Sequence, residues 1–351
     1  LCSSSARATN DNDATVNAHR RYSPRGCRAP AAPLCDSEPP PTLPTRWPPL
    51  VITPPRPAHR RHLILSPTLR PDITIGLRGD RAAAPVRNGF SLLGDGKDPV
   101  RAIESFQAAQ QVDAKGPFAG RAMLGLAQAR YQTKDIDGAA DAFLRVVTGY
   151  SDVKLNEQTY GWAAEHLFGQ KKWEHAAAMY AALLKGVPDY PTPERVKFRI
   201  AECSDQGGQA DKAIELYQGV VDTAPLSSSA VEAKFRMAKL FEGKNDVAKA
   251  LDFYEQAATT NTGDTAAAAR YRIAELLEGK QDFASAAKSY LQIHLMFLDP
   301  QRGPESLWRA GQCFEKASDA VNAKRAYSDL AKSYPESEQA GKANTRLSEL
   351  G

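Results

Sequence analysis

The chain repeats itself about every 37 residues, and this period constrains its fold more than any other feature. An alanine four residues before an aromatic residue recurs at seven places, and the spacing is 37 residues except for one step of 36. The seven pairs are Ala102/Phe106, Ala139/Phe143, Ala176/Tyr180, Ala213/Tyr217, Ala250/Tyr254, Ala286/Tyr290 and Ala323/Tyr327. A fixed period of about 20–50 residues indicates an array of stacked units.

A second column of residues lies upstream of each pair and is small in six units: Ala127, Ala164, Ala201, Ala238, Ala274 and Gly311. In the first unit this position falls on Phe90. Apolar neighbours follow the column at helical spacing, as in Met237 and Phe241. Each unit is therefore predicted to be two amphipathic helices joined by a short turn.

The turns have recognisable signals. Gly243 and Gly279 are predicted to take the left-handed conformation that ends a helix, and Asp246 and Asp282 are predicted N-caps of the second helices. Helices should stop before the prolines that follow the second helices, which are Pro188, Pro225 and Pro335.

These columns resemble the tetratricopeptide repeat over residues 89–350. The period of 37 exceeds the usual 34. The resemblance implies an all-α, right-handed solenoid of about seven helix-turn-helix units, with a capping helix from Ser337 to Leu350. The last unit, with its Tyr-Pro-x-Ser junction, is similar to bacterial cell-envelope repeat proteins of the Tol-Pal coordinator and outer-membrane-assembly types.

Residues 1–88 have a different composition. Residues 1–90 contain 13 Arg, no Lys and 6 acidic residues, whereas residues 91–351 contain 32 basic and 35 acidic residues. The tail is rich in proline and has no apolar periodicity, so we expect it to be disordered. It could be a linker or a wrongly assigned start, a proline-rich ligand, or an arginine arm for nucleic acid or an anionic surface.

No catalytic constellation is visible in the sequence. The stretch from Gly94 to Lys97 lacks the glycine spacing and the Ser or Thr of a phosphate loop. His166 and His175 have no thiol pair and no HExxH pattern beside them, so we expect neither a metal nor a cofactor. The chain is predicted not to be an enzyme.

The cysteines are predicted to be unbridged in the array. Cys203 and Cys313 occupy equivalent columns three units apart. Helices pack about 8–10 Å apart, so these thiols should lie beyond the reach of a disulfide.

The candidate binding residues form columns in the first helices of the last four units. Phe198, Phe235, Tyr271 and Trp308 make the aromatic ladder, and each is followed by one residue of the arginine ladder: Arg199, Arg236, Arg272 and Arg309. Seven residues after each aromatic comes the acidic column: Asp205, Glu242, Glu278 and Glu315. Aromatic and arginine side chains dominate binding hot spots.

Two interpretations of these columns stay open. The rings could pack between helices while each arginine pairs with an acid, such as Glu202 after Arg199 or Glu275 after Arg272. Alternatively, the ladder binds a partner, because Leu124 and Gly161 replace the aromatic in earlier units. The resemblance implies that a partner segment would lie in a concave groove lined by first helices.

The function predicted from the sequence is a non-enzymatic scaffold that binds a protein or peptide, with Glu242 and Glu278 beside the ladder. The alternatives are a regulatory array attached to an enzyme, or binding of an anionic surface through the tail. Broad contact with nucleic acid is disfavoured because residues 91–351 are net acidic. No stretch is apolar enough to span a membrane. The chain begins at Leu1, so a signal peptide could be missing. The periplasm or cell envelope is favoured, with the cytoplasm as the alternative, and the oligomeric state is not predicted.

Overall fold

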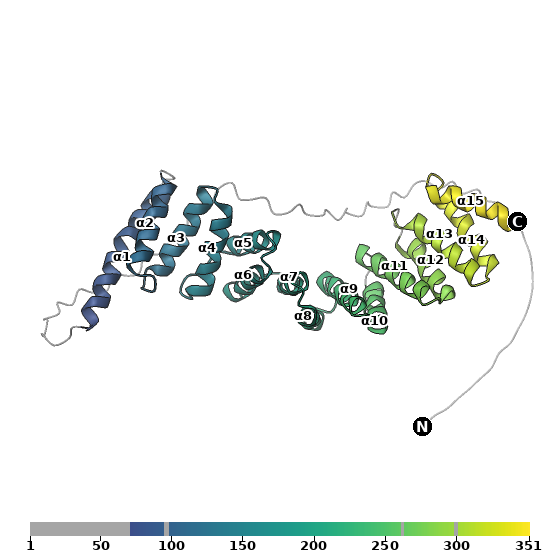
Figure 1. The fold of residues 1–351 in the computed structure, drawn as a ribbon, viewed down its shortest axis with the longest axis horizontal. Coiled ribbons are helices and arrows are strands. Elements are labelled where there is room, and N and C mark those ends of the chain that lie inside the picture. Colours follow the sequence, from purple (N-terminus) through teal and green to yellow (C-terminus); the bar gives the residue numbers. More distant parts are fainter. Residues whose placement is uncertain (1–70, 95–97, 261–262, 298–300) are drawn as a thin grey trace, which may run out of the picture. The chain divides into compact units, whose positions relative to one another are not determined.

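The computed structural model describes residues 71–94, 98–260, 263–297 and 301–351, and these ranges contain helices but no strand (Figure 1). The helices are α1 (Pro71–Gly94), α2 (Pro99–Val112), α3 (Ala119–Gln132), α4 (Ile136–Gly149), α5 (Glu157–Gly169), α6 (Trp173–Gly186), α7 (Pro193–Gln206), α8 (Ala210–Thr223), α9 (Ser228–Gly243), α10 (Val247–Thr260), α11 (Asp264–Gly279), α12 (Phe283–Phe297), α13 (Gly303–Lys316), α14 (Ala320–Ser333) and α15 (Glu338–Leu350). The predicted all-α class is confirmed.

The helices form a stack of pairs. Each helix packs against the next in chain order, and first helices also touch the first helix of the following pair, as α7 does with α9 and α13 with α15. Seven pairs, from α1/α2 to α13/α14, therefore correspond to the seven predicted units, and α15 follows as the predicted final helix. Ala340 and Ala343 of α15 are buried, whereas Lys342 and Glu338 are exposed. One side of α15 thus packs on the stack and another is polar.

The turn inside each pair is built on a left-handed residue followed by an N-cap. The predicted caps Asp246 and Asp282 are confirmed, because each carboxylate accepts a hydrogen bond from the backbone N–H three residues later. The prediction for Gly243 and Gly279 is wrong. Both are the last residues of their helices, and the left-handed residues are Asn245 (φ 61°) and Gln281 (φ 63°).

The position of the N-cap explains why the left-handed residue is not the glycine at the helix end. The residue directly before the N-cap must reverse the chain, and it has positive φ in six turns whether or not it is glycine. These residues are Lys134, Lys171, Gly208, Asn245, Gln281 and Ser318. A glycine near the helix end is therefore not a guide to which residue is left-handed.

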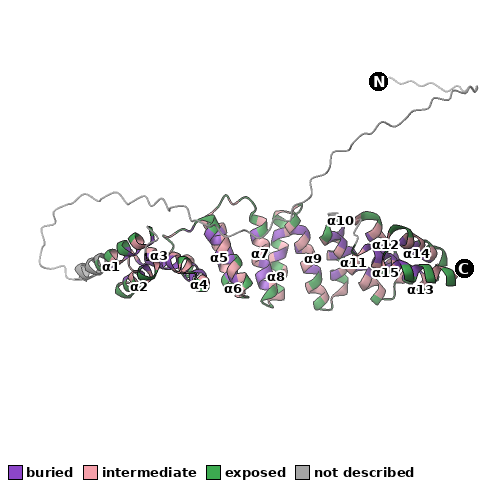
Figure 2. Ribbon diagram, turned by 90° about the horizontal axis from the view of Figure 1, so that it is seen from above, coloured by how far each residue is buried: buried purple, intermediate pink, exposed green. Residues whose placement is uncertain are grey.

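Buried residues follow both helices of the pairs (purple in Figure 2), and the repeated alanine and aromatic residue of the second helices are among them. Every one of these alanines is completely buried, and the rings of Phe106, Tyr217, Tyr254, Tyr290 and Tyr327 are completely buried as well. Burying such a ring contributes roughly 1.5–3 kcal/mol. The column found in the sequence is thus the main apolar seam between the helices of each pair.

The small column of the first helices allows the ring to approach. At Gly311 an added Cβ would lie 2.3 Å from the ring of Tyr327, so the two helices are in close contact there. In the first pair the equivalent residue is Gly89, where an added Cβ would lie 2.7 Å from the ring of Phe106. The predicted position Phe90 is therefore wrong by one residue, because the column lies 13 residues before the alanine in this unit and 12 before it in the others.

Helix α1 begins before the predicted edge of the array. Residues 71–88, which the sequence reading assigned to the Pro/Arg-rich tail, are helical, and Ala82 and Val86 are each 2% exposed. Ala82, Val86, Gly89 and Leu93 follow helical spacing, a signal that Pro85 and the flanking arginines obscured. Residues 1–70 and 95–97 lie outside the described residues. The turn predicted from Gly94 to Lys97 is therefore described only at Gly94. The domain boundary at residues 88 and 89 stays a prediction.

Candidate functional site

The aromatic ladder lies on the first helices α7, α9, α11 and α13, and all four rings are partly exposed. Each ring rests against the buried tyrosine of the second helix in its own pair. The ring centroids are 5.3 Å apart for Phe198 and Tyr217, and 5.5 Å apart for Phe235 and Tyr254. The distances are 5.5 Å for Tyr271 and Tyr290 and 5.2 Å for Trp308 and Tyr327. One side of each ladder ring is therefore fixed by packing while another part meets solvent.

The acidic column accepts hydrogen bonds from the same buried tyrosines. The Tyr217 hydroxyl donates to Asp205 (3.3 Å) and the Tyr254 hydroxyl donates to Glu242 (2.9 Å). The two later pairs are equivalent: Tyr290 to Glu278 (3.3 Å) and Tyr327 to Glu315 (2.6 Å). These acids thus satisfy a buried hydroxyl, a structural role that the sequence did not reveal.

The arginine ladder is tied to acids of two successive pairs. Arg199 binds Glu165 of α5 and Glu202 of its own helix, each at 2.5 Å. Arg236 in turn binds Glu202 (3.2 Å) and Glu232 of its own helix (3.1 Å). Glu202 therefore bridges two arginines.

The same pattern continues through the last pairs. Arg272 binds Glu242 of α9 and Glu275 of its own helix. Arg309 binds Glu275 (3.3 Å), Glu305 (3.1 Å) and the Tyr290 hydroxyl (3.0 Å). The pairing with Glu202 and Glu275 that the sequence offered as the packing alternative is present, and it also joins neighbouring units.

Two residues that take part in the arginine–carboxylate contacts were not predicted from the sequence. Arg346 of α15 lies 37 residues after Arg309, and it ion-pairs with Glu315 as the fifth member of the arginine ladder. Glu165 lies 37 residues before Glu202 and holds Arg199. Both residues could have been predicted from the sequence, by counting one period back from Glu202 and one period on from Arg309.

Successive first helices touch through an equivalent pair of residues at each junction, about 31 residues apart in the sequence. The chemistry of this pair changes along the array. In the first half they hold two rings, Tyr131 and Trp162, with centroids 5.0 Å apart at 90°. At the next junction the Arg199 guanidinium lies 3.9 Å from the centre of the Phe168 ring. The later junctions are ion pairs: Glu242–Arg272, Glu278–Arg309 (3.9 Å) and Glu315–Arg346.

Asp205 is the exception in this series. It accepts the Tyr217 hydroxyl, but no lysine or arginine within the described ranges forms an ion pair with it. The aspartate is one methylene shorter than glutamate, and Arg236 turns instead to Glu202 and Glu232. The charge of this carboxylate is therefore not compensated by a cation in direct contact.

Burial dominates the acid–base properties of the buried tyrosines. Burial, followed by the hydrogen bond to Glu242, raises the pKa of Tyr254 far above its ordinary value of 10.0. The pKa of Tyr327 is raised in the same way, by burial and then by Glu315. Conversely, the hydrogen bond from Arg346 is the main cause that lowers the pKa of Glu315 below 4.5.

The cysteines of the array are not nucleophiles poised for reaction. Cys203 and Cys313 are free and buried, so the predicted absence of a disulfide between them is confirmed. Burial is the largest cause that raises the pKa of Cys203 to about 12 and that of Cys313 to about 11. The thiolate form is therefore scarce at neutral pH.

The two histidines of the sequence reading lie at different contacts. His166 stacks on Trp162 and lies 2.8 Å from an Asp137 oxygen, whereas His175 is exposed beside a cavity described below. Within the described residues, no group of three or more His, Cys, Asp or Glu side chains is arranged to hold a metal ion. None of the described helices combines the length and apolarity needed to cross a bilayer.

Comparisons with known proteins point to one kind of repeat. Family models described as tetratricopeptide repeat match residues 91–153, 163–228 and 305–337, all within the predicted array. No curated protein matches the sequence.

Solved structures are similar at low identity. PilF of Pseudomonas aeruginosa is 15% identical (TM-score 0.30), with 77% of this chain and 99% of that chain covered. Yeast Tom70 is 17% identical (TM-score 0.39), with 79% and 55% covered. BtubC of P. vanneervenii is 14% identical (TM-score 0.34), with 74% and 90% covered.

Proposed function

This chain carries tetratricopeptide repeats, and from that premise we propose that it is a non-enzymatic scaffold that binds a segment of a partner protein along the aromatic ladder. The proposed binding residues are those predicted from the sequence: Phe198, Arg199, Phe235, Arg236, Tyr271, Arg272, Trp308 and Arg309, flanked by Glu242 and Glu278. They lie on successive first helices, the surface on which repeats of this kind would form a concave groove.

The observation that carries the proposal is the way the ladder rings are held. Each ring is fixed on one side by a buried tyrosine and keeps another part exposed. The arginine beside it is fixed by at least two carboxylates. Side chains that are already ordered lose little conformational entropy on binding, so a rigid row of rings favours recognition of a partner.

The charges around the ladder suggest the chemistry of the partner. Because the arginines are paired within the array, they offer little attraction to an acidic partner, and the rings favour apolar or aromatic side chains. Asp205 is different, since it has no cation in direct contact among the described residues. A basic residue of the partner placed between apolar residues would complement Asp205 and the neighbouring Phe198 and Phe235.

A cell-envelope protein is the partner class to test first, because the last unit resembles envelope repeat proteins. The full chain and a variant with Phe198→Ala, Phe235→Ala, Tyr271→Ala and Trp308→Ala would be used to capture proteins from a bacterial envelope extract. A captured partner is then purified and its affinity measured by titration calorimetry. We expect single ladder substitutions to weaken binding by roughly tenfold, or about 1.4 kcal/mol.

The matched control replaces exposed apolar residues outside the ladder: Val100→Ala, Leu226→Ala and Val321→Ala. Circular dichroism of both variants must show the unmodified helix content. Equal capture and equal affinity by the ladder variant, the control and the unmodified chain would leave the ladder with a packing role alone.

A further inference from the structure

Three polar side chains meet where α4 of the second pair contacts α5 of the third pair. Asp137 lies in the first turn of α4, His166 lies in the last turn of α5, and Gln170 follows four residues later at the end of that helix. The His166 Nε2 atom lies 2.8 Å from an Asp137 oxygen and 3.1 Å from the Gln170 side-chain nitrogen. That nitrogen also contacts the same Asp137 oxygen. The three atoms therefore form a closed triangle.

Hydrogen bonds alone do not satisfy this triangle. A carboxylate oxygen only accepts and an amide nitrogen only donates, whereas the Nε2 atom of a histidine either donates or accepts. If the Nε2 atom of His166 accepts, its lone pair faces the lone pairs of Asp137. If it donates, its N–H faces the N–H groups of Gln170. One of the three contacts is therefore unfavourable in each protonation state of the imidazole.

The side-chain oxygen of Gln170 is a second, independent sign of a ligand. This atom is buried, and it accepts no hydrogen bond from the described residues. A half turn of the carboxamide exchanges its oxygen and its nitrogen. The oxygen then enters the triangle, and one buried atom without a partner remains as before. Three atoms with lone pairs, one from each residue, then face one another, and a cation satisfies all three at once.

The geometry and the local charge fit a metal ion. Bonds of about 2.1 Å place neighbouring ligands of an octahedral ion about 3 Å apart, and both distances from the His166 Nε2 atom are close to this value. The imidazole ring is held in place by stacking on Trp162, with ring centroids 5.7 Å apart. Asp137 forms no ion pair with a lysine or arginine of the described residues, so the group has one uncompensated negative charge.

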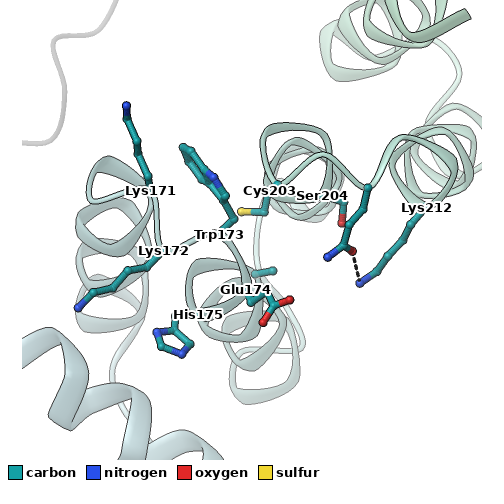
Figure 3. Close-up of a pocket in the computed structure, with 11 residues that line it drawn as sticks. Lys171, Lys172, Trp173, Glu174, His175, Cys203, Ser204 and Lys212 are labelled. Carbon is teal, nitrogen blue, oxygen red and sulfur yellow. Dashed lines mark hydrogen bonds between the residues drawn. The ribbon is translucent and has the colours of Figure 1, made fainter. Parts of the chain in front are cut away.

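The neighbouring lysine is directed to another carboxylate (Figure 3). The turn directly after Gln170 borders a cavity of about 330 Å³, and Trp173 is part of its wall. In Figure 3 the side chain of Lys172 points away from Trp173, and its ammonium binds Asp141 of α4 at 2.9 Å. Lys172 is thus neutralised by Asp141, and the charge of Asp137 is left for a different cation.

We propose that Asp137, His166 and Gln170 bind a divalent transition-metal ion such as Zn²⁺. The ligands are a carboxylate oxygen, the imidazole Nε2 atom and the turned carboxamide oxygen. Water fills the remaining positions, since the Asp137 side chain is 69% exposed. Imidazole and carboxylate are ordinary ligands of zinc. The ion joins the second pair of helices to the third, at a junction that lies outside the aromatic ladder.

The sequence expectation of no metal at His166 rested on patterns within one segment of the chain. The proposed ligands come from two helices, and Asp137 and His166 are 29 residues apart in the sequence. The third ligand is an amide, which belongs to none of the usual zinc patterns. Spacing alone therefore does not indicate this group, and the contact between α4 and α5 assembles it.

The test is a titration of the full chain with ZnCl₂, followed by ¹H–¹⁵N NMR. We expect saturable shifts of the Asp137, His166 and Gln170 amide signals. The three cysteines and three histidines before residue 71 can also bind zinc, so the signals of α4 and α5 decide the outcome and the total uptake of metal does not. The proposal is overturned if these amide signals do not shift, or if their shifts do not saturate.

Three variants test the ligands, and circular dichroism must show the unmodified helix content for each. His166→Ala removes a ligand, so we expect the affinity measured at the remaining signals to fall at least about tenfold. The control His175→Ala removes an exposed histidine that lines the cavity and should leave the affinity unchanged. Gln170→His replaces an amide by a stronger zinc ligand and should tighten binding at least about tenfold. Unchanged affinity in His166→Ala, or no gain in Gln170→His, would overturn the proposed ligand set.

Discussion

At the scale of single residues, Glu202 is the side chain that connects two repeats most directly. It is 9% exposed and binds Arg199 of its own helix and Arg236 of α9. Without Glu202, Arg199 would keep only Glu165 and Arg236 only Glu232, and partly buried charges that lose a partner are costly. Glu202 is thus expected to matter for stability although it was not among the predicted site residues.

We expect Glu202→Gln to lower the free energy of unfolding by about 1–2 kcal/mol, because two partly buried arginines each lose a charged partner. Urea denaturation followed by circular dichroism measures the change. Lys239 occupies the same column one unit later, is exposed and has no ion-pair partner among the described residues. Lys239→Gln is the control and should alter stability by less than about 0.5 kcal/mol. Equal effects of the two substitutions would contradict the bridging role.

Two glycines of first helices give a second prediction at this scale, in which substitution by alanine changes the stability in opposite directions. A Cβ added at Gly125 would lie 2.2 Å from the Phe106 ring, whereas nothing lies within 4 Å of one added at Gly161. We expect Gly125→Ala to destabilise the chain by about 1–3 kcal/mol and Gly161→Ala to stabilise it by about 0.5–1 kcal/mol. Calorimetric melting of both variants tests the close approach, which two shifts of the same sign would refute.

The single residues show why part of the site could not be predicted. The columns of Phe198, Arg199 and Glu242 were visible because the period repeats them. Glu165 and Arg346 continue the arginine contacts but stand outside the aromatic ladder, so the pattern of rings does not indicate them. The tyrosine hydroxyl that each acid accepts depends on the distance between two helices, and sequence spacing alone does not give that distance.

At the scale of the helices, the buried tyrosines of the second helices make the stability of the folded chain depend on pH. The folded state keeps Tyr254 neutral, and its pKa is raised above the 10.0 of the unfolded chain by burial and by Glu242. A raised pKa of this kind contributes stability that is fully present below pH 10 and is lost as pH rises above it. Tyr180, Tyr217, Tyr290 and Tyr327 add to the same effect, since burial raises the pKa of each.

We therefore expect the chain to unfold cooperatively at alkaline pH, with tyrosinate absorbance of these residues appearing only as helix content is lost. Tyr254→Phe should weaken stability near pH 7 by roughly 0.5–1.5 kcal/mol, because a hydrogen bond is removed. Phe106 and Phe143 already fill this column in other pairs, so the ring fits without its hydroxyl. The variant should lose less stability between pH 10 and 12 than the unmodified chain, and an equal loss would count against the assignment.

The helical elements were largely predictable and their turns less so. Alanine and aromatic columns fix which faces meet, so helix pairs and the caps Asp246 and Asp282 followed from the sequence. The left-handed residue did not, because the cap geometry places it at Asn245 and Gln281 rather than at the nearby glycines. In these turns the left-handed residue is the one directly before the N-cap, and its residue type matters little.

At the scale of the whole molecule, helix α1 raises the question of where the folded array begins. It covers α2, whose Ala102 and Phe106 are completely buried, and the helix extends from Pro71 through the predicted boundary at residue 89. The sequence did not predict the helix over residues 71–88, since its apolar face is interrupted by Pro85 and flanked by arginines, and the boundary at residues 88 and 89 stays a prediction. The residues before position 71 lie outside the described part of the chain.

We expect a chain that begins at residue 71 to be more stable than one that begins at residue 89, because the shorter chain uncovers the buried face of α2. Hydrogen exchange of the α2 amides should be markedly faster in the shorter chain, while exchange in α13 and α14 is unchanged. Calorimetry of both chains provides the stability difference. Identical exchange in α2 would place the edge of the folded array at residue 89.

The change of chemistry at the contact between first helices has a consequence for how the array responds to its surroundings. The Tyr131–Trp162 contact is apolar, whereas Glu242–Arg272 and Glu315–Arg346 are electrostatic and partly exposed. Dissolved salt screens the second kind but not the first, with a Debye length of about 8 Å at physiological ionic strength and about 3 Å at 1 M. Raising the salt concentration should therefore loosen the junctions of the later repeats and leave the early ones closed, so that one end of the array becomes adaptable while the other remains rigid.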